Sequence, residues 1–156
     1  MGTDPGTGTT ADSDEAMGDV ELSGAVARHA TIIYVYATSI NTAAQEAVDK
    51  NLAPVITSSY SSCEPESADT LRYLAQQANA QGITWMVVTN DSGAAACDDH
   101  HVARQLVSTG YAIAYPTSIP EITAVGGTEF NDGSGNYWAS TNTPNGACAL
   151  YYIPEI

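Results

Sequence analysis

The stretch LRYLAQQANAQGITWMVVT, which runs from Leu71 to Thr89, decides the fold. Its first half carries leucines and alanines at helical spacing and ends at Gly82, so the pattern predicts a helix over Glu64–Gln81. Its second half is a β-branched and aromatic run, which predicts a buried strand over Ile83–Thr89. A helix that leads directly into a buried strand is the repeating unit of an α/β sheet.

Similar patterns occur on both sides of this stretch. Strands that alternate with helices through short links predict parallel pairing with right-handed crossovers, so successive loops leave the sheet at one edge. We therefore expect an α/β fold with a largely parallel sheet flanked by helices. The other expected strands are Thr31–Ala37, Pro54–Ser59 and Ile122–Val125. The other expected helices are residues 14–28 and Asn41–Asn51, with Asn41 as N-cap; residues 1–13 are expected to form a loop and Phe130–Trp138 a hairpin.

The composition indicates an acidic globular protein. The 156 residues suffice for one domain, and 44% hydrophobic against 14% charged residues is not a disordered profile. The net charge of −14 repels phosphate backbones and anionic lipid headgroups, so we expect neither nucleic acid nor membrane as a partner. Such a charge fits any acidic soluble protein, and it also fits a protein that works in acid, where protonation removes the self-repulsion.

Two of the three cysteines follow consecutive expected strands. Cys63 and Cys97 therefore lie in loops that the fold brings side by side, which makes a disulfide between them plausible. The alternative is a pair of free, small apolar residues. Cys148 is left over. A bridge would indicate an oxidising compartment and hence export.

No Cys-x-x-Cys pair is present, and the adjacent residues of Asp98–His101 do not converge on one point, so we expect no metal site.

Three carboxylates are candidates for chemistry. Glu15 and Asp19 are four positions apart on one expected helix, which places them on the same face, where one of two close carboxyls is driven to hold a proton. The alternative is a solvated pair that favours the helix dipole. Asp91 follows an apolar strand, where a protonated acid could donate a hydrogen bond to an oxyanion. Its alternative is an ordinary turn aspartate.

Several motifs, in order, resemble the sedolisin family of serine-carboxyl peptidases over about residues 3–155. The sequence EAMGDVELSGAVA from Glu15 is similar to the helix that holds the family's catalytic Glu and Asp. The sequence VITSSY from Val55 resembles its substrate-binding strand, and NDSGAAACD from Asn90 resembles the segment of its oxyanion aspartate. The sequence IPEITAVGGT from Ile119, followed by YIPE from Tyr152, completes the likeness.

The resemblance implies a subtilisin-like fold and a secreted endopeptidase that acts on polypeptides at acidic pH. Glu15 would be the general base, Asp19 would orient it, and Asp91 would stabilise the oxyanion. The backbone of Ser59, Tyr60 and Ser61 would line the substrate as an added strand. A carboxylate replaces histidine as base only in acid, because a base works best when its pKa lies near the working pH.

The resemblance also implies that the chain is a partial catalytic domain. The family's nucleophilic serine, in a Gly-Thr-Ser segment, and its calcium site are expected downstream of residue 156, and its pro-segment upstream. We also find no secretory signal in the opening residues. Residues 1–156 would then be inactive alone and monomeric if folded. The alternatives are a non-catalytic module that binds extended peptides along Ser59–Ser61, or an inert gene fragment.

Overall fold

The computed structural model describes residues 6, 8–64, 71–98, 110–128 and 131. The chain divides into two units, Met1–Val125 and Gly126–Ile156. The first unit contains all the helices and strands that are described here. The hairpin expected over Phe130–Trp138 falls outside the described residues apart from Asn131.

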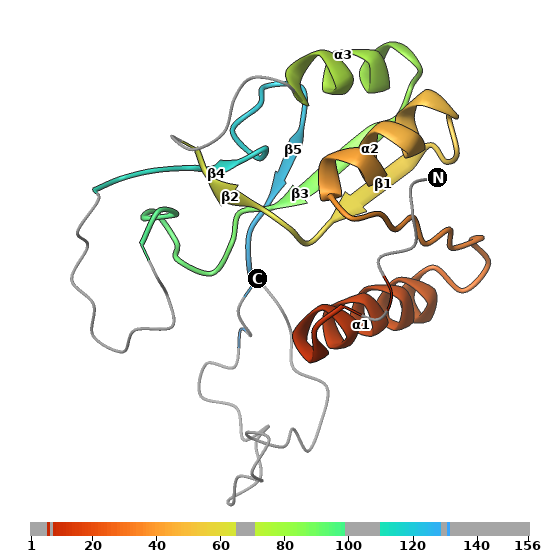
Figure 1. The fold of residues 1–156 in the computed structure, drawn as a ribbon, viewed down its shortest axis with the longest axis horizontal. Helices are drawn as coiled ribbons and strands as arrows, with labels where there is room; N and C mark the ends of the chain where they lie inside the picture. The colour runs from red at the N-terminus through yellow and green to blue at the C-terminus, as the bar shows by residue number, and fades with distance from the viewer. Residues whose placement is uncertain (1–5, 7, 65–70, 99–109, 129–130, 132–156) are drawn as a thin grey trace, which may run out of the picture. The chain divides into compact units, whose positions relative to one another are not determined.

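A parallel three-stranded sheet forms the centre of the first unit, in the order β1-β3-β5 (Figure 1). The strands are β1 (Val55–Ser58), β3 (Thr84–Val88) and β5 (Thr123–Val125), each slightly shorter than expected. In the register of β1 and β3, Ser58 pairs with Val87. The parallel α/β arrangement expected from the sequence is confirmed.

Two amphipathic helices cover one face of this sheet. They are α2 (Ile40–Asp49) and α3 (Arg72–Ala80), and each buries small apolar residues toward the strands. Helix α2 begins one residue earlier than expected, with Ser39 rather than Asn41 as N-cap. The expected helix over Glu64–Gln81 is present in its second half, and residues 65–70 lie outside the described residues.

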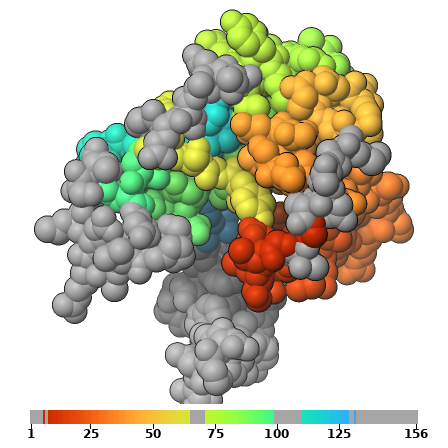
Figure 2. All heavy atoms as spheres, in the orientation of Figure 1, coloured from red at the N-terminus to blue at the C-terminus, as the bar shows by residue number. Residues whose placement is uncertain are grey.

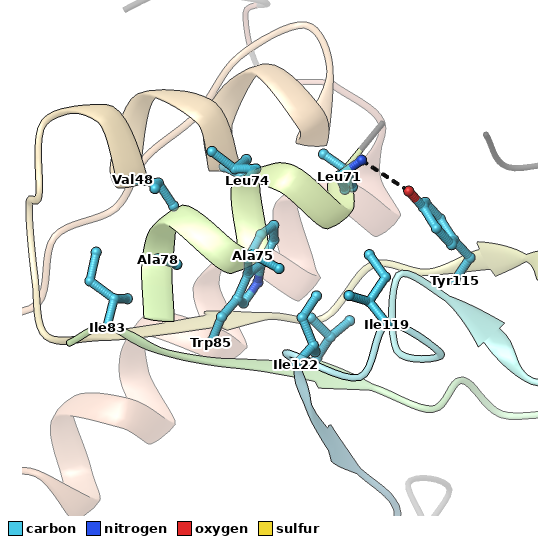
Figure 3. Close-up of a cluster of buried hydrophobic side chains, with 12 residues drawn as sticks. Val48, Leu71, Leu74, Ala75, Ala78, Ile83, Trp85, Tyr115, Ile119 and Ile122 are labelled. Atoms are coloured by element: carbon cyan, nitrogen blue, oxygen red, sulfur yellow. Dashed lines mark hydrogen bonds between the residues drawn. The ribbon is translucent and has the colours of Figure 1, made fainter. Parts of the chain in front are cut away.

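The core lies between these helices and the sheet (Figure 3). Val48 and Val87 are almost completely buried, with 0% and 1% of their surface exposed. Each such side chain stabilises the fold by about 1.5–3 kcal/mol through burial. The hydroxyl oxygen of Tyr115 accepts a hydrogen bond from the Leu71 amide at 3.1 Å, which closes one end of the core.

A second, two-stranded antiparallel sheet joins β2 (Ser62–Cys63) to β4 (Ala114–Tyr115). The sequence did not predict it, because two-residue strands are too short to show any periodicity. This small sheet holds the chain that follows β1, and so it fixes the course of the segment from Ser59 to Ser61.

The prediction of a strand over Thr31–Ala37 is wrong. This segment forms no ladder with another strand among the described residues, and the side chains of Ile33 and Tyr34 are about half exposed, at 48% and 55%. Residue types encode a preference for extended backbone, but a strand also needs a neighbour for its N–H and C=O groups. Tyr34 and Tyr36 stack on each other instead, with ring centroids 5.9 Å apart.

The first helix, α1 (Thr10–Val26), begins earlier than expected, so residues 10–13 are helical rather than part of a loop. Thr9 and Asp12 form a capping box: the Thr9 hydroxyl oxygen accepts from the Asp12 amide, and the Asp12 carboxylate accepts from the Thr9 amide. No side chain of α1 is buried. Among the described residues, no helix is long and apolar enough to cross a membrane.

Candidate functional site

The candidate site begins where β1 ends. Ser59 follows the last residue of β1, at the carboxyl edge of the sheet, where open α/β sheets place their ligands. Its hydroxyl donates a hydrogen bond of 2.8 Å to Oδ1 of Asp19, which is partly buried in the middle of α1. This bond spans 40 positions of sequence and connects a residue of the expected catalytic pair to the expected substrate segment.

Glu15 lies one turn before Asp19 on α1 and is exposed. The four-residue spacing places both carboxylates on one face of the helix. Between them, the position that a Cβ of Gly18 would occupy has no atom within 4 Å apart from its chain neighbours and the nearby backbone of α1, so nothing packs closely against the helix there. This arrangement leaves Glu15 accessible to an incoming group, while Asp19 is already engaged with a hydroxyl donor.

Tyr60 lies beside the same helix. Its side chain is 40% exposed. Burial raises the pKa of the Tyr60 phenol, and the negative charges of Asp12, Glu15 and Asp19 raise it further. The phenol therefore stays protonated and available as a hydrogen-bond donor, and these carboxylates lie within electrostatic reach of the segment that follows β1. Sequence reasoning missed Asp12, although the spacing of Thr9 and Asp12 is that of a capping box.

An open hollow of about 1300 Å³ extends from α1 along β1. Its walls come from α1, the extended segment after it, α2, and β1 with Ser59 and Tyr60. In Figure 2, the yellow atoms around the end of β1 lie directly beside the red atoms of α1. Ser61, which is partly exposed, continues the chain from this hollow into β2.

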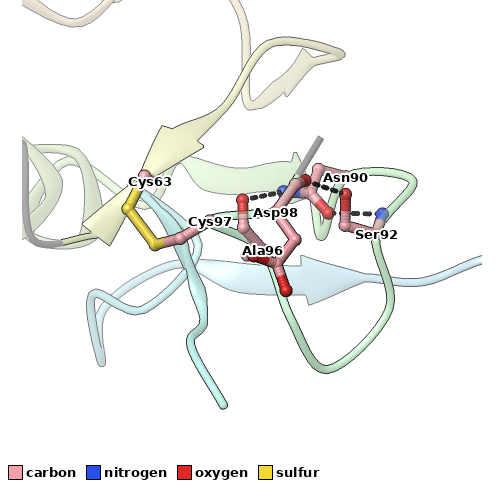
Figure 4. Close-up of a disulfide and its surroundings, with 6 residues drawn as sticks. All are labelled: Cys63, Asn90, Ser92, Ala96, Cys97 and Asp98. Atoms are coloured by element: carbon pink, nitrogen blue, oxygen red, sulfur yellow. Dashed lines mark hydrogen bonds between the residues drawn. A yellow bond between two sulfur atoms is a disulfide. The ribbon is translucent and has the colours of Figure 1, made fainter. Parts of the chain in front are cut away.

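The loop that follows β3 carries Asp91, which is exposed. Figure 4 shows the neighbouring Asn90 and Ser92 in this loop. Asn90 adopts a left-handed conformation with φ of 63°, and its side-chain oxygen accepts from the Ser92 amide at 2.9 Å. The Ser92 hydroxyl in turn donates to the backbone oxygen of Asp98 at 2.8 Å. These bonds fix the turn in which Asp91 is the central residue.

A disulfide joins Cys63 to Cys97, with the two Cα atoms 4.7 Å apart. Because β1 and β3 are parallel and in register, the segment after β1 and the loop with Asp91 leave the sheet at the same edge. The bridge then ties the two segments together covalently, with only Ser61 and Ser62 between Cys63 and Tyr60. The structure thus brings Asp19 to Ser59 and Tyr60, and it links that segment to the loop of Asp91.

Within the described part of the chain, no group of three or more His, Cys, Asp or Glu side chains converges as metal ligands do. The segment Asp98–His101 is described only at Asp98. The calcium expected for a complete family domain remains an expectation.

Comparison with known proteins gives one kind of match. No protein-family model matches the chain. No curated protein sequence matches it either. Among solved structures, the chain is similar to Pseudomonas sedolisin, a serine-carboxyl proteinase crystallised with two molecules of pseudo-iodotyrostatin. The match has a TM-score of 0.53 and 26% sequence identity, and covers 76% of this chain but only 34% of that protein. The chain therefore spans about a third of the structure it matches, and the likeness supports a sedolisin-like, protease-like fold.

Proposed function

We propose that this chain is part of an acid-acting, secreted serine-type endopeptidase. The observation that carries the proposal is the hydrogen bond from Ser59 to Asp19, which holds a helix with two carboxylates one turn apart against the segment after β1. The likeness to a serine-carboxyl proteinase supports the same assignment, because the matched structure belongs to that class.

In the proposed mechanism, Glu15 takes the proton from a serine hydroxyl as that oxygen attacks the scissile carbonyl. Asp19 orients Glu15 and shares its proton, and so it is a positioning residue. Asp91, as a neutral acid, donates a hydrogen bond to the oxyanion of the tetrahedral intermediate. The extended polypeptide substrate lies along Ser59, Tyr60 and Ser61 by adding a strand.

The attacking serine is not assigned to any residue of this chain. No Gly-Thr-Ser sequence occurs among the 156 residues. The Ser59 hydroxyl is bonded to Asp19, and the Ser92 hydroxyl is bonded within its turn. Since a nucleophile and its base act as one unit, we propose that residues 1–156 alone do not cleave peptides. Incubating the purified chain with an unfolded protein at pH 4 tests this, and cleavage that Glu15→Ala abolishes would overturn it.

The nucleotide sequence that follows codon 156 tests the proposed assignment itself. We expect a Gly-Thr-Ser codon run downstream in the same frame, followed by an aspartate-rich segment that could hold calcium. A stop codon directly after Ile156, with no such sequence nearby, would refute the peptidase assignment in favour of an inert fragment.

The second candidate function is a module that binds extended peptides without cleaving them. The open hollow along β1, with Ser59 and Tyr60 in its wall, favours it. The assay is fluorescence anisotropy with labelled unfolded peptides at pH 4 and pH 7. Saturable binding in the absence of cleavage, weakened by Tyr60→Ala, supports this reading; no binding at either pH excludes it.

A further inference from the structure

The turn that carries Asp91 also contains a short acceptor motif. Asn90-Asp91-Ser92 is an Asn-x-Ser tripeptide with a middle residue other than proline, which is the acceptor pattern for an N-linked glycan. It is the only such tripeptide in the 156 residues, because Asn142-Thr143 is followed by Pro144 and no other asparagine has Ser or Thr two positions later. A three-residue pattern also occurs by chance, so its position in the structure decides whether it can serve as an acceptor.

The structure places this tripeptide in a surface turn. Asp91 and Gly93 are exposed, and Asn90 and Ser92 are partly exposed. The Asn90 side-chain oxygen accepts from the backbone amide of Ser92, which holds the two residues together in the turn (Figure 4), while the Ser92 hydroxyl donates to the backbone oxygen of Asp98. Acceptor sites for glycans belong to such surface loops.

The amide nitrogen of Asn90 carries one hydrogen beyond the one used in its hydrogen bond. Nδ2 carries two hydrogens, and one of them is used in the bond of 3.1 Å to the backbone oxygen of Ala96. Replacing the other hydrogen by a sugar leaves an amide N–H that still donates.

The disulfide supplies an independent reason to place this loop in a secretory compartment. Cys97 lies seven positions after Asn90, in the same loop, and is bridged to Cys63. Disulfides of this kind form and persist in oxidising compartments, which is where glycan transfer to asparagine takes place.

We propose that Asn90 is an N-glycosylation site. In the transfer, Nδ2 of Asn90 attacks the anomeric carbon of an oligosaccharide carried on a lipid diphosphate. A C–N bond forms, the C–O bond to the diphosphate breaks, the lipid diphosphate leaves with the bonding electrons, and Nδ2 loses one proton. This proposal does not depend on peptidase activity.

The test is secretion of the full 156-residue chain from yeast behind an added, cleavable leader. We expect a heavier species that peptide N-glycosidase converts to the mass of the bare chain, with Asn90 recovered as aspartate. Ser92→Thr keeps the acceptor hydroxyl and should keep the heavier species. Asn90→Gln and Ser92→Ala should remove it, and Asn142→Gln is the matched control that should not.

Cell lysate and medium are both analysed, because transfer acts on the emerging chain and does not require that a variant folds. A chain that reaches the medium with Asn90 and Ser92 intact and shows no mass change with the glycosidase would overturn the proposal. So would a glycan that persists in Asn90→Gln.

Discussion

At the scale of the residue, the hydrogen bond between Ser59 and Asp19 matters most, because it holds α1 against the segment after β1. Helix α1 buries no side chain, so its position depends on polar contacts, and this one is partly shielded from water. The net contribution of one such intramolecular hydrogen bond is about 0.5–1.5 kcal/mol.

We predict that Ser59→Ala loosens α1 by about 1 kcal/mol, because a net hydrogen bond of this kind has about that value. Amide hydrogen exchange along Thr10–Val26 measures the effect, with roughly fivefold faster exchange expected. Ser61→Ala is the matched control, since Ser61 makes no side-chain hydrogen bond among the described residues. Equal exchange rates in both variants would show that the contact does not hold the helix.

Glu121 gives a prediction on pH. Its carboxylate accepts hydrogen bonds from Gln76 at 3.0 Å and from Arg72 at 3.4 Å, and its backbone oxygen accepts from Asn79 at 3.2 Å. The hydrogen bond from Gln76 lowers the pKa of Glu121 most, against the opposing effect of burial. A backbone hydrogen bond of Glu121 itself, and then the charge and hydrogen bond of Arg72, lower this pKa further. A lowered folded-state pKa stabilises the fold above the unfolded-state value and ceases to do so as the pH falls through the folded-state value.

We therefore predict that Glu121→Gln destabilises the chain at pH 7 relative to the parent, and that the difference shrinks once the pH falls well below 4. Urea unfolding at pH 7, 5 and 3 measures it. A difference that stays constant over this range would mean that the carboxylate charge plays no part in holding Arg72 and Gln76.

At the scale of the element, the buried side chains of α2, α3 and β3 supply most of the core that stabilises the fold. Val48 on α2 is completely buried, whereas Val26 at the end of α1 is 88% exposed. We predict that Val48→Ala lowers the free energy of unfolding by about 2 kcal/mol, through lost burial and the cavity it leaves. Val26→Ala, the same substitution at an exposed site, should change it by less than about 0.5 kcal/mol in a denaturant titration. Similar losses in the two variants would mean that the core lies elsewhere.

The sequence predicted elements well wherever one segment carried its own pattern. The helix at Leu74 has apolar residues at helical spacing, the strand at Trp85 is a β-branched and aromatic run, and both elements are present. Thr31–Ala37 has the residue types of a strand, yet whether a strand forms depends on a neighbour that local sequence does not specify. The short pairing of Ser62 with Tyr115 is fixed by contacts distant in sequence and carries no local signal.

For the candidate site, the sequence predicts the spacing of the carboxylates on α1, but it does not predict which of them contacts the segment after β1. Four-residue spacing places Glu15 and Asp19 on one face whatever the helix packs against. Which of the two meets Ser59 depends on how α1 lies against the end of β1, and the structure selects Asp19. The disulfide between Cys63 and Cys97 could be predicted in part, because the expected sheet topology made it plausible although no local pattern specified it.

At the scale of the whole molecule, the disulfide and the net charge have opposite effects on the stability of the folded chain. The bridge closes a loop with a sequence separation of 34, which by loop entropy stabilises the fold by about 3–4 kcal/mol. We predict a loss of that order in Cys63→Ser, measured by urea unfolding under non-reducing conditions. A parent chain whose unfolding midpoint does not shift when a reductant is added would contradict it.

The net charge of −14 acts against compactness at neutral pH. The outer edges of β1 and β5 lack strand partners among the described residues, and such edges favour association. We predict that the chain melts broadly or aggregates at pH 7, and that moderate salt sharpens the transition by screening the charges. Differential scanning calorimetry with and without 0.5 M salt measures this, and a sharp, reversible transition at low salt would be the contrary finding.

The central claim, that a carboxylate on α1 serves as base in acid, is tested most directly by one cleavage assay. The protein encoded by the full reading frame is incubated with an unfolded polypeptide at pH 4, as parent, Glu15→Gln and Asp14→Asn. We predict a loss of at least about a thousandfold in kcat for Glu15→Gln and near-parental activity for Asp14→Asn, its exposed neighbour. Equal activity in the parent and in Glu15→Gln would contradict the account.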